Sequence, residues 1–120
     1  MRRILIVDDS VSMRQMVSFT LRQGGFDVVE AEHGKDALEK LKATTVDLVI
    51  TDLNMPLMDG ITLIRNLRSQ PAMKSKPILM LTTESQGTKK EEGKASGATG
   101  WIVKPFDADK LLKTLAMVLP

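Results

Sequence analysis

Short, almost wholly apolar runs alternate with longer amphipathic segments along the chain, and this alternation restricts the fold more than any other feature. The apolar runs lie at residues 4–7, 26–31, 46–51, 78–81 and 100–103. Strands that are buried on both faces of a parallel sheet have this continuous apolar character. The run at 26–31 also contains Asp27 and Glu30, which indicates a strand at the edge of the sheet.

The segments between these runs have apolar residues near helical spacing. They predict helices at 10–22, 35–43, 61–67, 89–98 and 107–119. Ser10 can cap the first helix, and Gly24 with Gly25 can end it. The helix at 89–98 has the poorest propensity because Gly93 lies inside it. Five strands that alternate with five helices predict an α/β fold: a single doubly wound, five-stranded parallel sheet with helices on both faces.

Length and composition are those of one globular domain. A chain of 120 residues buries roughly two-thirds of its unfolded surface, which is enough for a core. The absence of cysteine excludes disulfides and thiolate metal sites. The apolar run after Arg2 and Arg3 stops at Asp8 and is far shorter than the roughly 18 residues of a membrane span. We therefore read it as a strand and expect a cytoplasmic protein.

The charge of the chain does not indicate a nucleic-acid partner. The 17 basic residues are interleaved with 15 acidic ones, so that the net charge is only +2. The aromatic residues are three Phe and one Trp, which provides no stacking platform for bases. A solvated surface of mixed charge is the better interpretation.

Polar side chains follow the predicted strands at the point where each strand ends. Asp8 and Asp9 follow the first strand, Asp52 the third, Thr82 the fourth and Lys104 the fifth. The carboxyl ends of parallel strands meet at one edge of the sheet, where ligands bind. The pattern therefore places three carboxylates, a hydroxyl and an ammonium group in one cleft.

This set of groups suits phosphoryl transfer. Three neighbouring carboxylates repel one another unless a cation lies among them, and Mg²⁺ prefers such oxygen ligands. Lys104 and Thr82 can neutralise and position a phosphoryl group, and a carboxylate can accept it as an aspartyl phosphate. Taken singly, each aspartate could be a helix cap, Lys104 a solvated charge and Thr82 an ordinary strand residue. Their convergence at one edge favours a site.

The same residues form a recognisable set of motifs. The set is Asp8-Asp9, Asp52-x-Asn54-Met55-Pro56-x-x-Asp59-Gly60, Thr82 and Lys104-Pro105-Phe106. It resembles the response-regulator receiver domain of two-component signalling, and the resemblance extends from about Arg2 to Leu119. It implies one receiver domain over 1–120 without an effector domain, strand order 2-1-3-4-5, and a signalling protein that catalyses only its own phosphorylation and slow dephosphorylation.

The resemblance also implies a role for each matching residue. Asp52 would accept the phosphoryl group from a phosphohistidine of a partner sensor histidine kinase. Thr82 and Lys104 would hold the phosphoryl oxygens, and the Lys104–Pro105 peptide would be cis. One Mg²⁺ would be bound by Asp8, Asp9, Asp52 and the backbone carbonyl of Asn54.

Ser10-x-Ser12-Met13-Arg14 is similar to the chemotaxis class of this family, the CheY type. The implied target is a flagellar motor switch or another protein, with a phosphatase as a further partner and the protein itself a monomer. A phosphate sink or phosphorelay intermediate without a motor target is the alternative. Trp101 occupies the position of an aromatic ring that turns inward when Thr82 binds phosphate. Its alternative role is a partly exposed ring that packs on the fifth strand.

The remaining expectations concern the surface. The partner face would be formed by the fourth helix, fifth strand and fifth helix, and its basic character indicates acidic partners. Its candidate residues are Lys89, Lys90, Glu91, Lys94, Trp101, Lys110 and Lys113. Met55 and Glu84 would line the mouth of the site, where Glu84 either orients an attacking water or is only a surface charge. His33 is expected to be exposed to solvent and without a catalytic role.

Two other classes of protein share parts of this pattern. A flavodoxin-like electron carrier needs a phosphate-binding loop after the first strand, where this chain has Asp8 and Asp9. An aspartate-nucleophile phosphohydrolase has its nucleophile after the first strand in a longer chain, whereas the candidate here, Asp52, follows the third. Both are weaker interpretations than a receiver.

Overall fold

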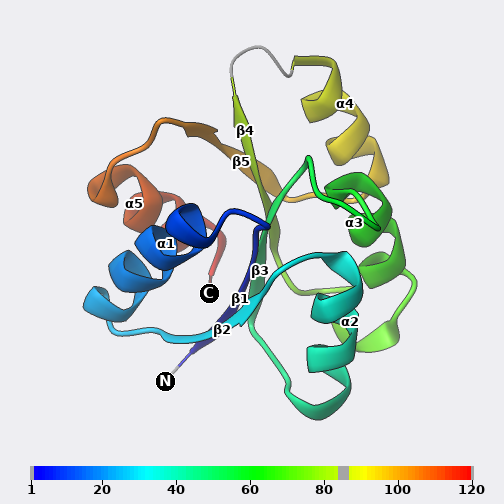
Figure 1. The fold of residues 1–120 in the computed structure, drawn as a ribbon, viewed down its shortest axis with the longest axis horizontal. Helices are drawn as coiled ribbons and strands as arrows, with labels where there is room; N and C mark the ends of the chain where they lie inside the picture. The colour runs from blue at the N-terminus through cyan, green and yellow to red at the C-terminus, as the bar shows by residue number, and fades with distance from the viewer. Residues whose placement is uncertain (1, 84–86, 120) are drawn as a thin grey trace.

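The computed structural model describes residues 2–83 and 87–119 of the chain (Figure 1). The elements in chain order are β1 Arg3–Val7, α1 Val11–Gln23, β2 Asp27–Ala31, α2 Gly34–Ala43, β3 Leu48–Asp52, α3 Gly60–Arg68, the 3₁₀ turn η1 Pro71–Met73, β4 Ile78–Thr83, α4 Gly87–Ser96, β5 Gly100–Lys104 and α5 Ala108–Val118. The strands form one parallel sheet in the order β2-β1-β3-β4-β5. This confirms the predicted fold class and the strand order that the family resemblance implied.

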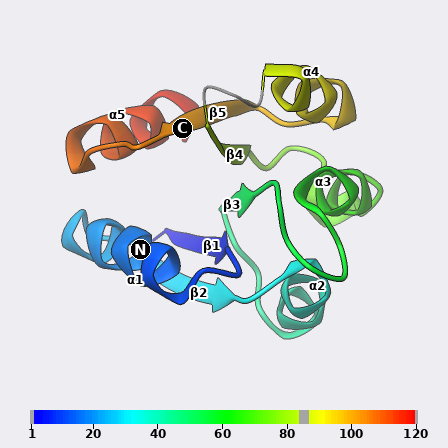
Figure 2. The same ribbon diagram turned by 45° about the horizontal axis from the view of Figure 1, so that its top comes forward.

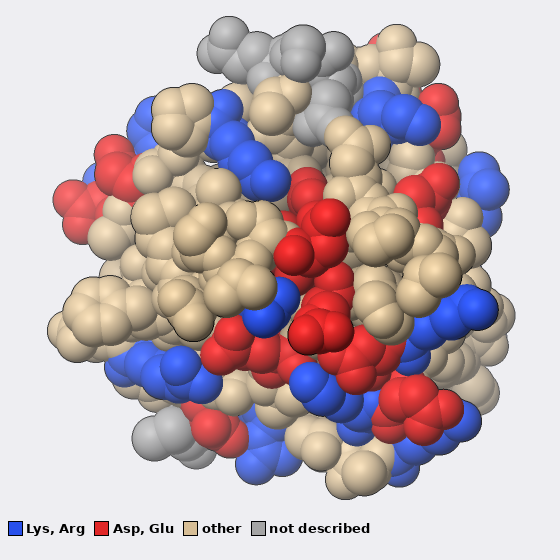
Figure 3. Space-filling model, in the orientation of Figure 1, with Lys and Arg blue, Asp and Glu red and all other residues tan. Residues whose placement is uncertain are grey.

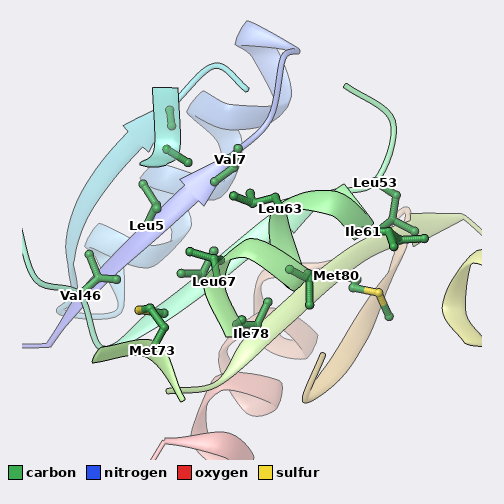
Figure 4. Close-up of a cluster of buried hydrophobic side chains, with 14 residues drawn as sticks. Leu5, Val7, Val46, Leu53, Ile61, Leu63, Leu67, Met73, Ile78 and Met80 are labelled. Carbon is green, nitrogen blue, oxygen red and sulfur yellow. The ribbon is translucent and has the colours of Figure 1, made fainter. Parts of the chain in front are cut away.

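The sheet lies between two layers of helices. Figure 2 shows α1 and α5 on one side and α2, α3 and α4 on the other. Successive side chains of a strand point to opposite faces, so each strand contributes to both cores. Ile4 and Ile6 of β1 pack in the core under α1 and α5, whereas Leu5 and Val7 pack in the core under α2 and α3 (Figure 4). The central strands are therefore apolar on both faces up to the polar residues at their carboxyl ends.

Side-chain caps set the starts of several helices. The Ser10 hydroxyl accepts from the Met13 backbone N–H at the start of α1, as predicted. Asp59 caps α3 in the same way through the Thr62 N–H. The expectation that His33 is simply exposed is wrong. His33 is half-buried because its Nδ1 accepts from the Asp36 N–H, so the ring is held as the cap of α2.

The edges of the sheet are β2 and β5. The prediction that Asp27 and Glu30 mark an edge strand is confirmed. Both carboxylates pair with arginines: Asp27 with Arg3 at 2.7 Å and Glu30 with Arg14 at 3.1 Å. None of the helices in the described part of the chain is long and apolar enough to cross a membrane.

Candidate functional site

The carboxyl ends of β1, β3, β4 and β5 bring the predicted polar residues to one edge of the sheet. Asp52 is the last residue of β3 and pairs in register with Leu81 of β4. Thr82 follows Leu81, and the next residue, Thr83, pairs with Lys104 at the end of β5. The strand order thus determines which side chains share the edge.

Three carboxylates form a compact cluster there. Asp8, Asp9 and Asp52 each have a carboxylate oxygen within 4.8 Å of the corresponding oxygens of the other two. Asp8 and Asp52 are buried and Asp9 is exposed, so that the cluster opens to solvent on one side. In Figure 3 acidic side chains form a strip across the centre of this face, with uncharged surface on both sides.

Asp8 is the most deeply buried member of the cluster. It is fully buried, and its Oδ1 accepts from the Ser10 backbone N–H at 2.9 Å. Its Oδ2 has no hydrogen-bond partner among the described residues. Burial raises the pKa of Asp8, and the negative charge of Asp52 raises it further, against the lowering effect of the Ser10 hydrogen bond.

Lys104 supplies the nearest positive charge. Its Nζ lies 3.2 Å from Asp52 Oδ1 and 4.0 Å from Asp8 Oδ2. One ammonium group against three ionised carboxylates leaves two negative charges in excess. The cluster therefore remains attractive to a divalent cation.

The residues present fit a bound Mg²⁺. The buried Asp8 Oδ2 is a hard oxygen donor without a partner, and Asp9 and Asp52 provide two more carboxylates beside it. A donor set made only of oxygen matches Mg²⁺ better than softer metals. Asn54, two residues after Asp52, is exposed in the loop that leaves β3.

Thr82 has the second unsatisfied polar group at this edge. The residue is fully buried and its Oγ1 has no hydrogen-bond partner in the described structure. A buried hydroxyl without a partner destabilises the folded state, so it calls for an explanation beyond packing. A phosphoryl oxygen bound at Asp52 would be an acceptor of the right kind.

Arg14 supports the site and was not predicted to do so. Its Nη1 donates to the Asp8 carbonyl at 2.8 Å and its Nε to Glu30 at 3.1 Å, with only 12% of the side chain exposed. Arg14 therefore ties the loop of the two aspartates to β2. The sequence does contain a signal, because Arg14 lies at helical spacing from the buried Val17 and Leu21 on the inward side of α1.

The loop after Asp52 returns tightly to the strand. The Gly60 N–H donates to the Leu53 carbonyl, and a Cβ on Gly60 would lie 2.3 Å from the Asp52 carbonyl oxygen. Only glycine allows this approach. Asp59 caps α3 and is not part of the carboxylate cluster. Met55 is half-buried against the core, and Glu84 lies outside the described residues.

Trp101 lies away from the carboxylates, on the side of α4. It is 38% exposed, and its ring lies under Lys90 Nζ at 5.7 Å and Lys94 Nζ at 5.1 Å. These are cation–π distances. The Lys104–Pro105 peptide is cis, as the family resemblance implied.

Of the other predicted partner-face residues, Lys110 and Lys113 line a groove beside β5, whereas the lysines of α4 do not. Lys89 and Lys94 of α4 and Lys110 of α5 are exposed. The groove between β5 and α5 has a volume of about 840 Å³. Its lining includes Trp101, Val103, Phe106, Lys110, Lys113 and Met117.

Comparison with known proteins agrees with this geometry. The family model for the response regulator receiver domain matches residues 4–116. The chain is 42% identical over 119 residues to the chemotaxis protein CheY1 of Helicobacter pylori, covering 98% of this chain and 96% of that protein. It is 44% identical over 114 residues to the chemotaxis protein CheY-3 of Vibrio cholerae, with coverages of 94% and 88%.

The fold is also closely similar to that of a solved structure. The chemotaxis protein CheY4 of Vibrio cholerae superposes with a TM-score of 0.94 and 52% identity over 99% of both chains. Such domains serve in signalling and are not enzymes with a separate substrate. This chain belongs to the response regulator receiver domain family, and the relatives it matches at this level are chemotaxis regulators of the CheY type.

Proposed function

We propose that this chain is one receiver domain that is phosphorylated on Asp52 in a Mg²⁺-dependent reaction and signals from the cytoplasm. The observation that carries the proposal is the pair of unsatisfied buried oxygens, Asp8 Oδ2 and Thr82 Oγ1, at the edge where Asp52 ends β3. A cation would satisfy the first and a phosphoryl group the second.

The proposed reaction moves one phosphoryl group between two side chains. A carboxylate oxygen of Asp52 attacks phosphorus as the P–N bond to a phosphohistidine breaks, and the imidazole that leaves takes up a proton from solvent. Lys104, 3.2 Å from Asp52, neutralises charge on the phosphoryl oxygens, and the Thr82 hydroxyl donates to one of them. Asp8, Asp9, Asp52 and the Asn54 carbonyl would hold the Mg²⁺, which offsets the negative charge of both reactants.

The output surface of the proposal is the face formed by α4, β5 and α5. Phosphorylation would draw Thr82 toward the phosphoryl group and change the space beside Trp101, two residues before the Val103 that pairs with Thr82. Lys89, Lys90, Lys94 and Lys110 favour an acidic protein partner on this face. The relatives are chemotaxis proteins, which supports a motor-type target over a phosphate sink or relay.

Phosphorylation by a small donor tests the chemistry directly. The protein is incubated with acetyl phosphate, with and without Mg²⁺, and the mass of the intact chain is recorded. We expect a gain of one phosphoryl group that requires Mg²⁺ and is absent in Asp52→Asn. Labelling that persists in Asp52→Asn, or that ignores the metal, would contradict the proposal.

The fluorescence of Trp101 tests the coupling to the output face, because it is the only tryptophan. We expect one change on addition of Mg²⁺ and a second on addition of donor, the latter lost in Asp52→Asn. A mass gain without the second change would retain Asp52 as acceptor and remove Trp101 as reporter.

A further inference from the structure

Hydrogen bonds hold three of the four polar groups of Asp8, the buried aspartate of the carboxylate cluster. Its backbone N–H donates to the Ala31 carbonyl at 3.1 Å, and its Oδ1 accepts from the Ser10 N–H at 2.9 Å. Its backbone carbonyl accepts from Arg14 Nη1 at 2.8 Å. Only Oδ2 lacks a hydrogen-bond partner among the described residues, and this is the oxygen that the proposed function assigns to Mg²⁺.

The sheet does not supply the donor for the Asp8 carbonyl. The pairing of β1 with β2 and with β3 ends at Val7 on both sides. Asp8 is fully buried, so its carbonyl would lack a partner and destabilise the fold if no other segment provided a donor. The donor comes from α1, through the Arg14 side chain, of which only 12% is exposed.

Glu30 of β2 holds the other side of the Arg14 guanidinium. Arg14 Nε donates to Glu30 Oε1 at 3.1 Å, and the Glu30 carbonyl accepts from Lys40 Nζ. A planar guanidinium that donates in two directions can bridge two acceptors in a fixed geometry. Arg14 thereby sets the position of the Asp8 backbone relative to β2.

The charge of Arg14 acts against a bound cation. The guanidinium contacts Asp8, so it adds a positive charge beside the residues that would hold Mg²⁺. If charge were its whole effect, removing it would strengthen Mg²⁺ binding. If its hydrogen bond fixes Asp8, removing it would weaken Mg²⁺ binding, because the ion would have to order a looser ligand. The two effects have opposite signs, so one titration separates them.

We propose that Arg14 is a positioning residue for the Mg²⁺ site, which holds the Asp8 carbonyl against β2 and so keeps Asp8 Oδ2 in place as a preorganised ligand. The proposal rests on the proposed function, because it takes Asp8 as a ligand of the ion. Glu30 neutralises much of the charge of Arg14, so the hydrogen bond should dominate. Hydrogen-bonded partners of metal ligands typically contribute roughly 10- to 100-fold to metal affinity.

Arg22 provides a matched control on the same helix. Its Nη2 lies 3.6 Å from Glu30 Oε2, so it pairs with the same carboxylate as Arg14, and no contact of Arg22 with Asp8 occurs in the described structure. Arg14→Met and Arg22→Met therefore remove the same charge from α1 and differ in the contact with the Asp8 carbonyl. Arg14→Lys keeps the charge without the planar fork, and it provides the test if Arg14→Met does not fold.

The probe is Mg²⁺ alone, titrated into the whole chain while NMR follows the backbone amide signals of residues 8–10. Urea unfolding without Mg²⁺ measures the stability of each variant. We expect the Kd to rise about tenfold in Arg14→Met and about fivefold in Arg14→Lys. Arg22→Met should change it by less than about twofold, because an exposed ion pair contributes little. Leu67→Ala, which leaves a cavity under α3, should lose stability and keep the wild-type Kd.

Four results would overturn the proposal. A Kd in Arg14→Met that is unchanged or lower would leave Arg14 only the effect of its charge, and a wild-type Kd in Arg14→Lys would show that a charge is enough. Equal weakening in Arg22→Met would assign the effect to Glu30 instead of the contact with Asp8. Equal weakening in Leu67→Ala would assign it to a general loss of stability. A wild-type chain that binds no Mg²⁺ would instead contradict the proposed function itself.

Discussion

Helices α3 and α4 lie side by side on the same face of the sheet, yet they are held there in different ways (Figures 1 and 2). Helix α3 buries four large or branched apolar side chains; these are Ile61, Leu63, Ile64 and Leu67. Helix α4 buries only Gly93, and a Cβ at that position would lie 1.9 Å from Met80 Sδ. One helix is part of the core and the other rests on it.

Contacts at its carboxyl end and along its middle supplement the packing of α4. Arg68 of α3 donates through Nε to the Gly97 carbonyl at 2.8 Å and through Nη1 to the Met73 and Lys76 carbonyls. This ties the carboxyl end of α4 to α3. Lys90 and Lys94 cover the Trp101 ring and tie the middle of α4 to β5.

The difference matches the positions of the two helices relative to the site. Helix α3 closes the loop of the proposed acceptor Asp52, which needs a constant geometry. Helix α4 follows Thr82 in the chain and buries only Gly93, which suits the proposed role of this region in signalling. A low density of apolar contacts is what permits local motion in a folded domain. The following predictions test this contrast, from the largest expected effect to the smallest.

Leu67→Ala should destabilise the protein by about 3 kcal/mol, because it leaves a cavity at a fully buried position under α3. The exposed Lys89→Ala in α4 is the matched control and should change stability by less than about 0.5 kcal/mol. Urea unfolding followed by circular dichroism measures both. Similar losses in the two variants would remove the distinction between the helices.

Thr82→Val should stabilise the unphosphorylated protein by about 1.5 kcal/mol, since valine has the same shape and removes a buried hydroxyl without a partner. The same variant should retain Mg²⁺ binding, measured by calorimetry, and lose the donor-dependent change of Trp101 fluorescence. A loss of stability would show that the hydroxyl already has a partner.

Gly93→Ala should destabilise the protein by about 1 kcal/mol, because the added methyl group would overlap the fully buried side chain of Met80. The higher helix propensity of alanine should offset only part of this cost. Amide hydrogen exchange should increase in α4 and remain unchanged in α3. Faster exchange in both helices would mean that they unfold as one unit.

Lys94→Met should cost about 0.5 kcal/mol, the order of one exposed cation–π contact, and should change the emission of Trp101. Lys89→Met is the control, since no contact of Lys89 with the ring occurs in the described structure. Equal spectra for the two variants would exclude the contact in solution.

Asp59→Asn should have the smallest effect, about 0.3 kcal/mol near neutral pH, because asparagine still caps α3 but lacks the charge at its amino end. The hydrogen bond from the Thr62 N–H lowers the pKa of Asp59 below 3.8. The stabilisation by this charge is therefore complete above the unfolded value and disappears as the pH falls through the folded one. Unfolding curves for both proteins should converge in acid; a constant difference would refute the assignment.

Much of the site could be predicted because its residues follow buried strands directly. Asp52, Thr82 and Lys104 each lie at the end of an apolar run, and parallel pairing brings such positions to one edge. The support from Arg14 was missed because it depends on contacts between separate segments, with the Asp8 carbonyl after β1 and with Glu30 of β2. The backbone φ of Leu57 is positive, at 68°. This was missed for a different reason, because leucine gives no local sign of a positive φ.

Helix α4 shows what helix propensity alone cannot predict about packing. Gly93 correctly indicated a weak helix, yet the same glycine is what lets the helix approach Met80. The cap formed by His33 could not be predicted either, because a histidine before a helix is seldom the acceptor that serine or aspartate would be.

By itself the sequence determined the alternation of strands and helices, the single parallel sheet and the edge at which the acidic, hydroxyl and ammonium groups collect. These follow from the period of apolar residues, which is a local property. Only the tertiary structure decided which oxygens lack partners and that Lys104 lies 3.2 Å from Asp52. Those features depend on the approach of segments far apart in the chain, where packing and hydrogen bonding across strands outweigh local preference.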